Sequence, residues 1–440
     1  MKIYPARRLR GLLRLPGDKS ISHRAALLSA LAEGQAVVNN FSTSADCAST
    51  LSCLRQLGVS IEREGTTVRI NGVGARGLRA SLQPLDCGNS GSTMRLLAGV
   101  LAGQDFVSHL TGDESLRARP MKRIIEPLRL MGARILASDG KAPLQITGRW
   151  PLLPLEYEME VMSAQVKSCV LLAALNARGR TQVIEEAGAT RDHTERMLRW
   201  FGVRIETRTG ESAGTLKSTL TIDGPTGFAA RDLSVPGDIS AAAFFIVAAA
   251  LLPGSRLEIK DVGLNPTRTQ ILQTLQTLGA VVRTRRLHER CEEARGDMEV
   301  CESSLSTSSG EGAILLRGPT IARLIDELPV LAVMGTQIPG GLEIRGAAEL
   351  RVKESDRIQA TVENLRAMGA RVEEFDDGMG IHGPTRLRGA QIRTHGDHRI
   401  AMAFTIAALL ADGESELDDA ACVSVSFPEF FELLESVIER

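Results

Sequence analysis

The chain contains two matching stretches, PGDKSISHRAALLSALAEG (residues 16–34) and PGDISAAAFFIVAAALLPG (residues 236–254). Each has a PGD turn, an Asp or Ser able to cap a helix, a long helix of small apolar residues and a closing Gly. Asp and Ser suit a helix start because their oxygens accept hydrogen bonds from free backbone N–H groups, and Gly suits a helix end. Only the first stretch carries Lys19, His23 and Arg24. We therefore expect a duplicated scaffold with an anion-binding site in one copy.

Length and composition indicate a globular protein of two or three domains, because 440 residues exceed what one core usually holds. The net charge is -1 and aromatic residues make up 3% of the chain, which argues against general nucleic-acid binding. Any anion site must therefore be local. The most apolar run, residues 241–252, is too short to span a membrane.

The seven cysteines form no CxxC pair, a pattern that favours buried thiols in a reducing cytosol over disulfides or a zinc site. No apolar segment typical of a signal peptide follows Met1. We expect a soluble, cytoplasmic protein without a metal.

A second pattern recurs at intervals of about 70 to 90 residues: LRQLGVSI (54–61), LRLMGARI (128–135), LRWFGVRI (198–205), LQTLGAVV (275–282) and LRAMGARV (365–372). In each, an amphipathic helix ends at a Gly and a strand begins. FFELLESVIER (430–440) resembles a sixth helix with its strand trimmed. The pattern predicts an α/β protein in which a helix–strand–turn–strand unit occurs about six times, three per half.

The PGD turns mark the expected crossings between the two halves. The N-terminal strand (residues 1–15) would then belong with the C-terminal half. We expect one discontinuous domain of residues 1–18 and 238–440, and a second of residues 19–237. The polar segment 284–312 predicts an exposed loop or extended hairpin, with a functional tail as the weaker alternative.

Cations gather at or near expected helix starts: Lys19, Arg24, Arg119, Lys353, Arg357 and Arg399. Taken singly, each fits a solvated surface position. Taken together in a near-neutral chain, they indicate small substrates with several negative charges, because the guanidinium fork matches carboxylate and phosphate. Lys353 and Arg357 would project together if their segment is helical. Asp326, just ahead of an apolar helix, is either a cap or a general base.

Nine motifs occur in the order of one known family: LPGDKSISHR, GNSGSTMRLL, SLRARPMKRI, SAQVKS, RDHTERML, PGDISAAAFF, DELPVL, LRVKESDRI and GDHRIAMAF. In these the chain resembles the 5-enolpyruvylshikimate-3-phosphate (EPSP) synthases. The resemblance implies two similar domains, each of three βαβαββ repeats in an inside-out α/β barrel, with the active site in the interdomain cleft. It implies transfer of the enolpyruvyl group of phosphoenolpyruvate to the 5-hydroxyl of shikimate 3-phosphate, with release of phosphate.

The resemblance also implies a role for each matching residue. Those expected to bind shikimate 3-phosphate are Lys19, Ser20, Arg24, Ser163, Ala164, Gln165, Arg191, Asp326 and Lys353. Those expected to bind phosphoenolpyruvate are Lys19, Gly91, Arg119, Gln165, Arg357 and Arg399. Asp326 would be the base for the attacking hydroxyl, and Glu354, helped by Lys19, the proton donor to the methylene carbon. Gly91 implies sensitivity to glyphosate.

Further expectations follow from the family: no metal or organic cofactor, a monomer without nucleic-acid or membrane partners, and a place in the shikimate pathway of chorismate and aromatic amino acid biosynthesis. Two departures stand out. Ala164 replaces a Ser found in many relatives, which leaves only a backbone contact. Ser424 and Val425 precede Ser426 where many relatives have a Lys.

Two alternative functions stay open at this point. An enolpyruvyl transferase acting on UDP-N-acetylglucosamine would share the fold, but it uses a loop cysteine, and residues 113–120 contain none. A non-catalytic protein that binds phosphorylated metabolites would not need carboxylates such as Asp326 and Glu354 among its cations.

Overall fold

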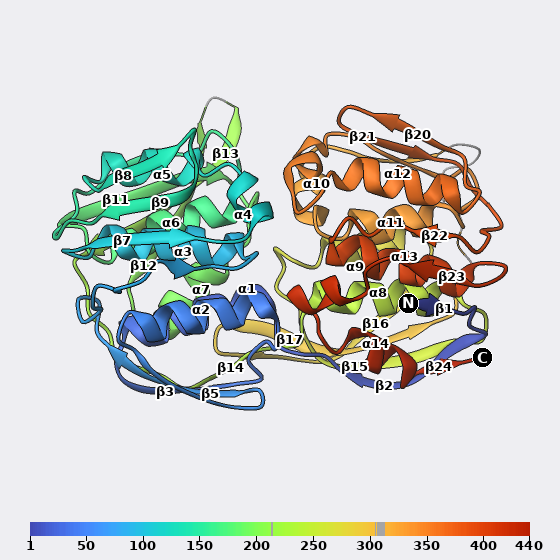
Figure 1. The fold of residues 1–440 in the computed structure, drawn as a ribbon, viewed down its shortest axis with the longest axis horizontal. Coiled ribbons are helices and arrows are strands. Elements are labelled where there is room, and N and C mark those ends of the chain that lie inside the picture. Colours follow the sequence, from blue (N-terminus) through green and yellow to red (C-terminus); the bar gives the residue numbers. More distant parts are fainter. Residues whose placement is uncertain (213, 304, 306–312) are drawn as a thin grey trace. The chain divides into compact units, whose positions relative to one another are not determined.

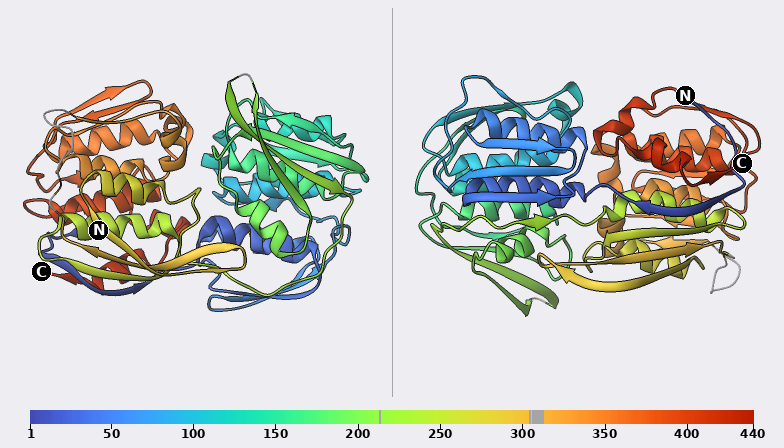
Figure 2. Two further views of the ribbon diagram at one scale, coloured as in Figure 1. Left: turned by 180° about the vertical axis from the view of Figure 1, so that it is seen from behind. Right: turned by 90° about the horizontal axis from the view of Figure 1, so that it is seen from below.

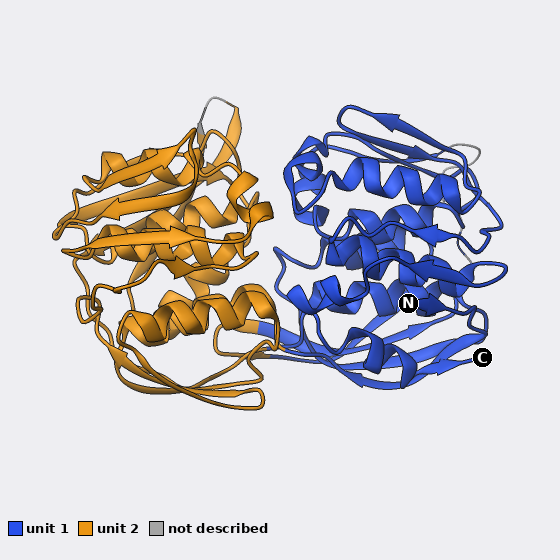
Figure 3. Cartoon of the chain, in the orientation of Figure 1, with its two compact units in different colours: residues 1–16, 236–288, 294–440 blue, residues 17–235, 289–293 orange. Residues whose placement is uncertain are grey.

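The computed structural model describes residues 1–212, 214–303, 305 and 313–440 (Figure 1). The chain divides into two compact units (Figure 3). Unit 1 comprises residues 1–16, 236–288 and 294–440, and unit 2 comprises residues 17–235 and 289–293.

One repeat of unit 2 shows the plan of the fold. Its elements are β6 (Leu85–Asp86), α3 (Gly91–Ala102), β7 (Val107–Thr111), α4 (Glu114–Ala118), α5 (Lys122–Leu130), β8 (Arg134–Ser138) and β9 (Lys141–Thr147). The sheet order is β6-β7-β9-β8. β6 and β7 are parallel, whereas β9 runs antiparallel to both β7 and β8. The parallel strands β6 and β7 need a helical crossover between them, whereas the antiparallel neighbours β8 and β9 need only a turn. This gives the expected βαβαββ order.

The other two repeats of unit 2 follow the same plan. One consists of β10 (Glu156–Glu158), α6 (Ala164–Ala174), β11 (Gly179–Glu186), α7 (His193–Trp200), β12 (Ile205–Ser212) and β13 (Thr215–Gly224). The other consists of α1 (Lys19–Leu31), β3 (Glu33–Asn39), α2 (Ala45–Gln56), β4 (Ser60–Glu64) and β5 (Thr67–Val73). Its first strand is β14 (Leu233–Ser234), which comes from the far end of the unit and lies parallel to β3.

The described residues of unit 1 also form three sheets. The middle repeat consists of β18 (Ile314–Leu316), α10 (Pro319–Leu324), α11 (Leu328–Gly335), β19 (Leu342–Ile344), η1 (Ala348–Val352), α12 (Arg357–Ala367), β20 (Val372–Phe375) and β21 (Gly378–Ile381). The last consists of β22 (Gln391–Ile392), α13 (His398–Leu410), β23 (Ser415–Leu417), η2 (Ala421–Val425) and α14 (Phe430–Glu435), and β1 (Lys2–Ile3) adds an antiparallel strand to β23. The N-terminus thus supplies the strand that the C-terminal sequence lacks.

The first repeat of unit 1 is built around β2 (Arg8–Arg14), α8 (Ile239–Leu251), β15 (Arg256–Gly263), α9 (Gln270–Thr277), β16 (Val281–Arg290) and β17 (Glu293–Cys301). β2 lies parallel to β15 inside a five-stranded sheet. The short β24 (Ile438–Glu439) after α14 pairs with the outer edge of β2. The N-terminal strand therefore belongs to unit 1, whose remaining residues all follow the second PGD turn.

Apolar helices occupy the interior of each unit and the sheets lie outside them (Figures 1 and 2). In unit 1, α8, α11 and α13 pack on one another, and α8 is buried on nearly every face because it carries apolar residues all round. In unit 2, α3 packs closely on α6. Gly99 permits this approach, since a Cβ there would lie 2.2 Å from the Cys169 carbonyl oxygen. The structure confirms the α/β class and the two similar units of three repeats.

The polar segment that begins at residue 284 forms an extended hairpin of β16 and β17, which confirms that alternative for its described part. Residues 304 and 306–312 lie outside the described residues. β17 is buried although it is rich in charge, because its carboxylates are paired: Asp297 with Lys260, and Glu299 with Arg256 and Arg285. Because charged residues occupy buried positions of β17, its sequence lacks the alternation of apolar and polar residues by which a strand is normally recognised.

Candidate active site

The start of α1 carries the first group of expected site residues. Asp18 caps the helix by accepting a hydrogen bond from the Ile21 N–H at 2.9 Å. Lys19, the first residue of α1, lies 2.8 Å from the Asp46 carboxylate through its Nζ atom, and its side chain is 18% exposed. The cap fixes the helix start, and the ion pair with Asp46 gives the lysine a defined position with access to a ligand.

Arg24 lies one turn along the same helix and is buried. Its Nε donates to Thr194 Oγ1 at 2.7 Å, its Nη2 to Ser168 Oγ at 2.7 Å, and its Nη1 to the Ser20 carbonyl at 2.9 Å. Burial disfavours the charge and lowers the pKa of Arg24 to about 10, and the nearby charge of Arg191 acts in the same direction. An anionic ligand at this place would relieve both effects.

The start of α3 provides a cradle at Gly91, the first residue of that helix. A Cβ at this position would lie 2.6 Å from Arg95 Nη1 and 3.4 Å from Arg119 Nη1. Arg95 Nη1 donates to Gln165 Oε1 at 2.8 Å, and Gln165 Nε2 donates to Ser92 Oγ at 2.9 Å. The guanidinium groups of Arg95 and Arg119 and the N-terminus of α3 therefore lie beside the space that a side chain at position 91 would occupy.

Arg119 follows the last residue of α4 and precedes α5, so it lies near a helix start without belonging to one. It is 8% exposed, and its Nη2 donates to Asn89 Oδ1 at 2.8 Å. Asn89 in turn donates to the Asp113 carboxylate at 2.7 Å. This chain of hydrogen bonds fixes the orientation of the guanidinium group.

In unit 1, Arg357 begins α12 and is held by two carboxylates. Its Nε lies 2.8 Å from Asp397 Oδ2, and its Nη2 lies 2.6 Å from Glu354 Oε2. Burial opposes the charge of this 1% exposed side chain, but the charges of Asp397 and Glu354 outweigh burial and raise the pKa of Arg357. Asp397 also caps α13 through the Arg399 N–H at 2.9 Å.

Asp326 lies between two guanidinium groups just ahead of α11. Its Oδ1 is 3.8 Å from Arg357 Nη1, and its Oδ2 is 3.8 Å from Arg399 Nη2. Arg399 Nη1 donates to the Asp326 carbonyl at 2.8 Å. Glu327, not Asp326, occupies the N-cap position of α11. The interpretation of Asp326 as a simple cap is therefore wrong.

Lys353 differs from the expectation of a shared helical face with Arg357. η1 ends at Val352 and α12 begins at Arg357, so the residues between them are not helical. Lys353 Nζ instead pairs with Glu349 Oε1 at 3.3 Å. Asp356 caps α12 through the Gln359 N–H, and this cap interrupts the helix just where the sequence suggested continuity.

Three further expected residues lie at the starts of α6 and α7. Ser163 precedes α6 and does not cap it with its side chain, whereas the Ala164 carbonyl accepts a hydrogen bond from Ser168 Oγ at 2.6 Å. Arg191 lies just before α7, close enough for its charge to act on Arg24. In unit 2 the structure thus groups Arg24 with Arg191, and Gly91 with Arg119.

Within each unit, sequence reasoning missed several residues that position the expected side chains: Asp46, Arg95, Ser168 and Thr194 in unit 2, and Asp397 in unit 1. Arg95 stands in the quoted motif GNSGSTMRLL, four positions after Gly91 on one helix face, which is a usable signal. Thr194 lies 170 positions from Arg24. No local pattern links residues so far apart in the sequence. Within the described residues, no helix combines the length and apolar character needed to cross a membrane.

Comparison with known proteins agrees with these clusters. The family model for EPSP synthase (3-phosphoshikimate 1-carboxyvinyltransferase) matches residues 3–434. The chain is 48% identical over 441 residues to the 3-phosphoshikimate 1-carboxyvinyltransferase of Koribacter versatilis, covering 100% of this chain and 99% of the relative. It is 50% identical over 439 residues to the protein of the same name from Salinibacter ruber, covering 99% and 98%.

A solved structure of EPSP synthase from Acinetobacter baumannii superimposes with a TM-score of 0.85 at 39% identity, covering 99% of this chain and 98% of that one. Sequence and fold thus point to the same family along the whole chain. The chain belongs to the EPSP synthase family, the 3-phosphoshikimate 1-carboxyvinyltransferases.

Proposed function

We propose that this chain transfers the enolpyruvyl group of phosphoenolpyruvate to the 5-hydroxyl of shikimate 3-phosphate and releases phosphate. The observation that carries the proposal is the placement of Asp326 and Glu354 beside Arg357, at 3.8 and 2.6 Å, which sets two carboxylates among cations. Anion binding alone would not call for acids in this place. Addition followed by elimination requires both a proton acceptor and a proton donor.

The proposed binding residues divide by substrate. Shikimate 3-phosphate is bound by Lys19, Ser20, Arg24, Ser163, the Ala164 backbone, Gln165, Arg191, Asp326 and Lys353. Phosphoenolpyruvate is bound by Lys19, Gly91, Arg119, Gln165, Arg357 and Arg399. The buried positions of Arg24 and Arg119 support these roles, because hydrogen bonds to a charged ligand are stronger away from water.

The acid–base roles follow from the contacts in unit 1. Asp326 is the proposed base that takes the proton of the 5-hydroxyl. Glu354, which is ion-paired with Arg357, is the proposed donor to the methylene carbon of phosphoenolpyruvate, assisted by Lys19. An incoming phosphoenolpyruvate anion would compete with Glu354 for Arg357. Displaced from its partner, Glu354 would gain the proton affinity that a donor needs.

A phosphate-release assay with both substrates, and with each omitted in turn, tests the reaction. Release that requires both substrates supports the proposal. Turnover with UDP-N-acetylglucosamine in place of shikimate 3-phosphate, or release without it, would refute the proposal. Asp326→Asn keeps the size of the side chain but removes the base, and we expect kcat to fall by about 100-fold or more. Full activity of this variant would refute the role of Asp326 as the base, whereas a wild-type protein that binds both substrates but releases no phosphate would favour a protein that only binds phosphorylated metabolites.

Inhibition by glyphosate tests the cradle at Gly91. The absence of a side chain leaves room beside Arg95 and Arg119, so we expect the wild-type protein to be inhibited. In Gly91→Ala the added methyl group pushes against Arg95, whose flexible end can yield, so the fold should survive. We expect weaker inhibition and a KM for phosphoenolpyruvate raised by about tenfold. An unchanged inhibition curve for this variant would contradict the proposed cradle.

We also propose the cofactor requirement, oligomeric state, location and pathway of the enzyme. The reaction needs no metal or organic cofactor, and the protein acts as a cytoplasmic monomer in the shikimate pathway of chorismate and aromatic amino acid biosynthesis. Activity that persists after treatment with a chelator checks that no metal is needed. The mass from light scattering checks that the protein is a monomer.

A further inference from the structure

The tip of the β16–β17 hairpin belongs to unit 2, although the residues on either side of it belong to unit 1. Its two turn residues, Cys291 and Glu292, have positive φ angles of 55° and 62°. Residues other than glycine rarely adopt this conformation, because their side chains make it strained. Contacts of the tip must therefore hold the turn in place.

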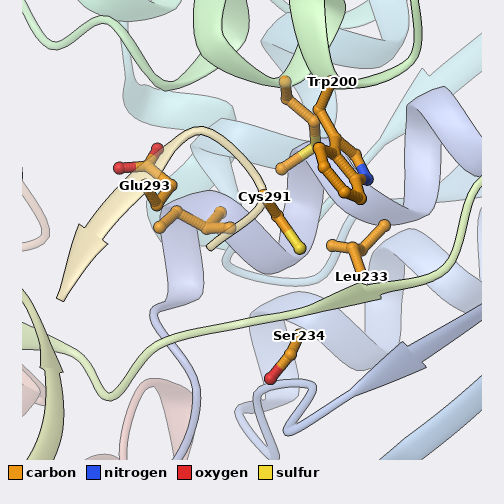
Figure 4. Close-up of a pocket in the computed structure, with 7 residues that line it drawn as sticks. Trp200, Leu233, Ser234, Cys291 and Glu293 are labelled. Atoms are coloured by element: carbon orange, nitrogen blue, oxygen red, sulfur yellow. The ribbon is translucent and has the colours of Figure 1, made fainter. Parts of the chain in front are cut away.

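The tip makes polar and apolar contacts with α7. Glu293 is 4% exposed, and its Oε1 lies 2.6 Å from Nδ1 of His193, the first residue of that helix. Arg196 Nη1 donates to the Glu292 carbonyl at 2.8 Å. Figure 4 shows Cys291 beside Trp200 and Leu233 in a small pocket, with Glu293 at the beginning of β17. Apolar packing and a buried side-chain hydrogen bond thus act on the same turn.

The first turn of α7 is tied to a different element at each of three consecutive residues. His193 binds the hairpin tip through Glu293. Thr194 accepts the hydrogen bond from Arg24 Nε of α1. Glu195 pairs with Lys167 of α6, with 2.6 Å between Oε1 and Nζ. A shift of His193 must therefore move Thr194, and with it the hydroxyl that orients Arg24.

We propose that Glu293 is a positioning residue for the shikimate 3-phosphate side of the site: by holding His193 it fixes the first turn of α7, and through Thr194 it orients Arg24. The inference rests on the proposed function, in which Arg24 and Arg191 bind that substrate. Arg191 lies two residues before His193, so the same anchor also limits its movement. The residue comes from a segment that none of the family motifs covers.

Steady-state kinetics of Glu293→Ala tests the proposal. We expect the KM for shikimate 3-phosphate to rise by about tenfold. The substitution removes the charge-assisted hydrogen bond between Glu293 and His193, which orients α7 and with it the Thr194 hydroxyl that binds Arg24. kcat and the KM for phosphoenolpyruvate should change by no more than about twofold. Glu293→Gln keeps an acceptor oxygen and should restore part of the affinity. Glu292→Gln is the matched control, since its contact to Arg196 uses the backbone carbonyl and survives the substitution.

A second readout is independent of activity. In a Cys301→Ser background, mass spectrometry follows modification of Cys291 by N-ethylmaleimide, and Glu293→Ala should speed this reaction by loosening the tip. If Glu293→Ala does not fold, the same two measurements on Glu293→Gln decide the question. An unchanged KM for shikimate 3-phosphate in active Glu293→Ala, or in active Glu293→Gln where the alanine variant does not fold, overturns the inference. A wild-type protein that does not turn over this substrate overturns the proposed function instead, whereas labelling still reports whether Glu293 holds the tip.

Discussion

At the scale of single residues, burial decides what a charged group can do. Arg24 and Arg357 are both buried, yet their pKa values move in opposite directions. Arg357 has the carboxylates of Asp397 and Glu354 within hydrogen-bonding distance, and these outweigh its loss of water. Arg24 is bound mainly by neutral oxygens, so the cost of burial dominates. The surroundings of Arg24 therefore favour binding of an anionic ligand.

His23 gives a prediction at this scale. The residue is fully buried, its Nδ1 lies 2.7 Å from Thr50 Oγ1, and burial, with the charges of Lys19 and Arg24, keeps its pKa well below 6.5. In the unfolded chain this histidine takes up a proton below pH 6.5, whereas in the folded chain it does not. Stability should therefore fall as the pH drops below 6.5, by up to about 1.4 kcal/mol per pH unit.

Urea denaturation of His23→Asn at several pH values checks this prediction. The variant should lose that part of the pH dependence between pH 6.5 and 5. His288→Asn, which changes an exposed histidine, should keep the slope of the wild type. Equal slopes for wild type and His23→Asn would show that His23 is protonated in the folded protein.

At the scale of elements, the helix starts carry both the fold and the chemistry. Asp397 shows this twofold role, since it caps α13 and binds Arg357, the first residue of α12. Sequence patterns predicted the helices and the acidic caps of the two PGD turns, Asp18 and Asp238, because a cap contacts residues two or three positions away. They did not predict that Asp397 would cap α13 and also bind a residue 40 positions earlier.

Asp397→Asn separates these two roles. Asn still caps a helix well, but it deprives the buried Arg357 of one of the two carboxylates within hydrogen-bonding distance. We expect a loss of about 3 kcal/mol in the free energy of unfolding, measured by urea denaturation. Asp223→Asn is the control, because it breaks an exposed pair with Arg180 and should leave stability unchanged. A similar midpoint for Asp397→Asn and wild type would mean that Glu354 and the more distant Asp326 suffice for Arg357.

At the scale of the whole molecule, one sheet in each unit takes a strand from a distant part of the chain. β14 opens the first sheet of unit 2, and β2 lies between β15 and β24 in unit 1. Leu9 and Leu13 of β2 are at most 1% exposed. The N-terminal strand is therefore part of the core of unit 1, although most of that unit follows the second PGD turn.

Deletion of residues 1–14 should destabilise unit 1 and leave unit 2 nearly unchanged. The deletion removes β1 and β2 and exposes the apolar face that β2 covers. Differential scanning calorimetry should then show one transition at a lower temperature and one near that of the wild type. Deletion of residues 438–440 removes only the edge strand β24 and should have a smaller effect. A common shift of all transitions would show that the units unfold together.

The sequence by itself determined the repeated βαβαββ units, the buried apolar helices, the acidic caps and the family, because all of these depend on residues close together in the chain or on ordered motifs. Only the tertiary structure decided which partners the charged residues take. Arg24 meets Thr194, Arg357 meets Asp397, and the tip at Glu293 returns to His193. Such pairs join distant positions, and their free energy depends on burial and distance, neither of which leaves a periodic trace in the sequence.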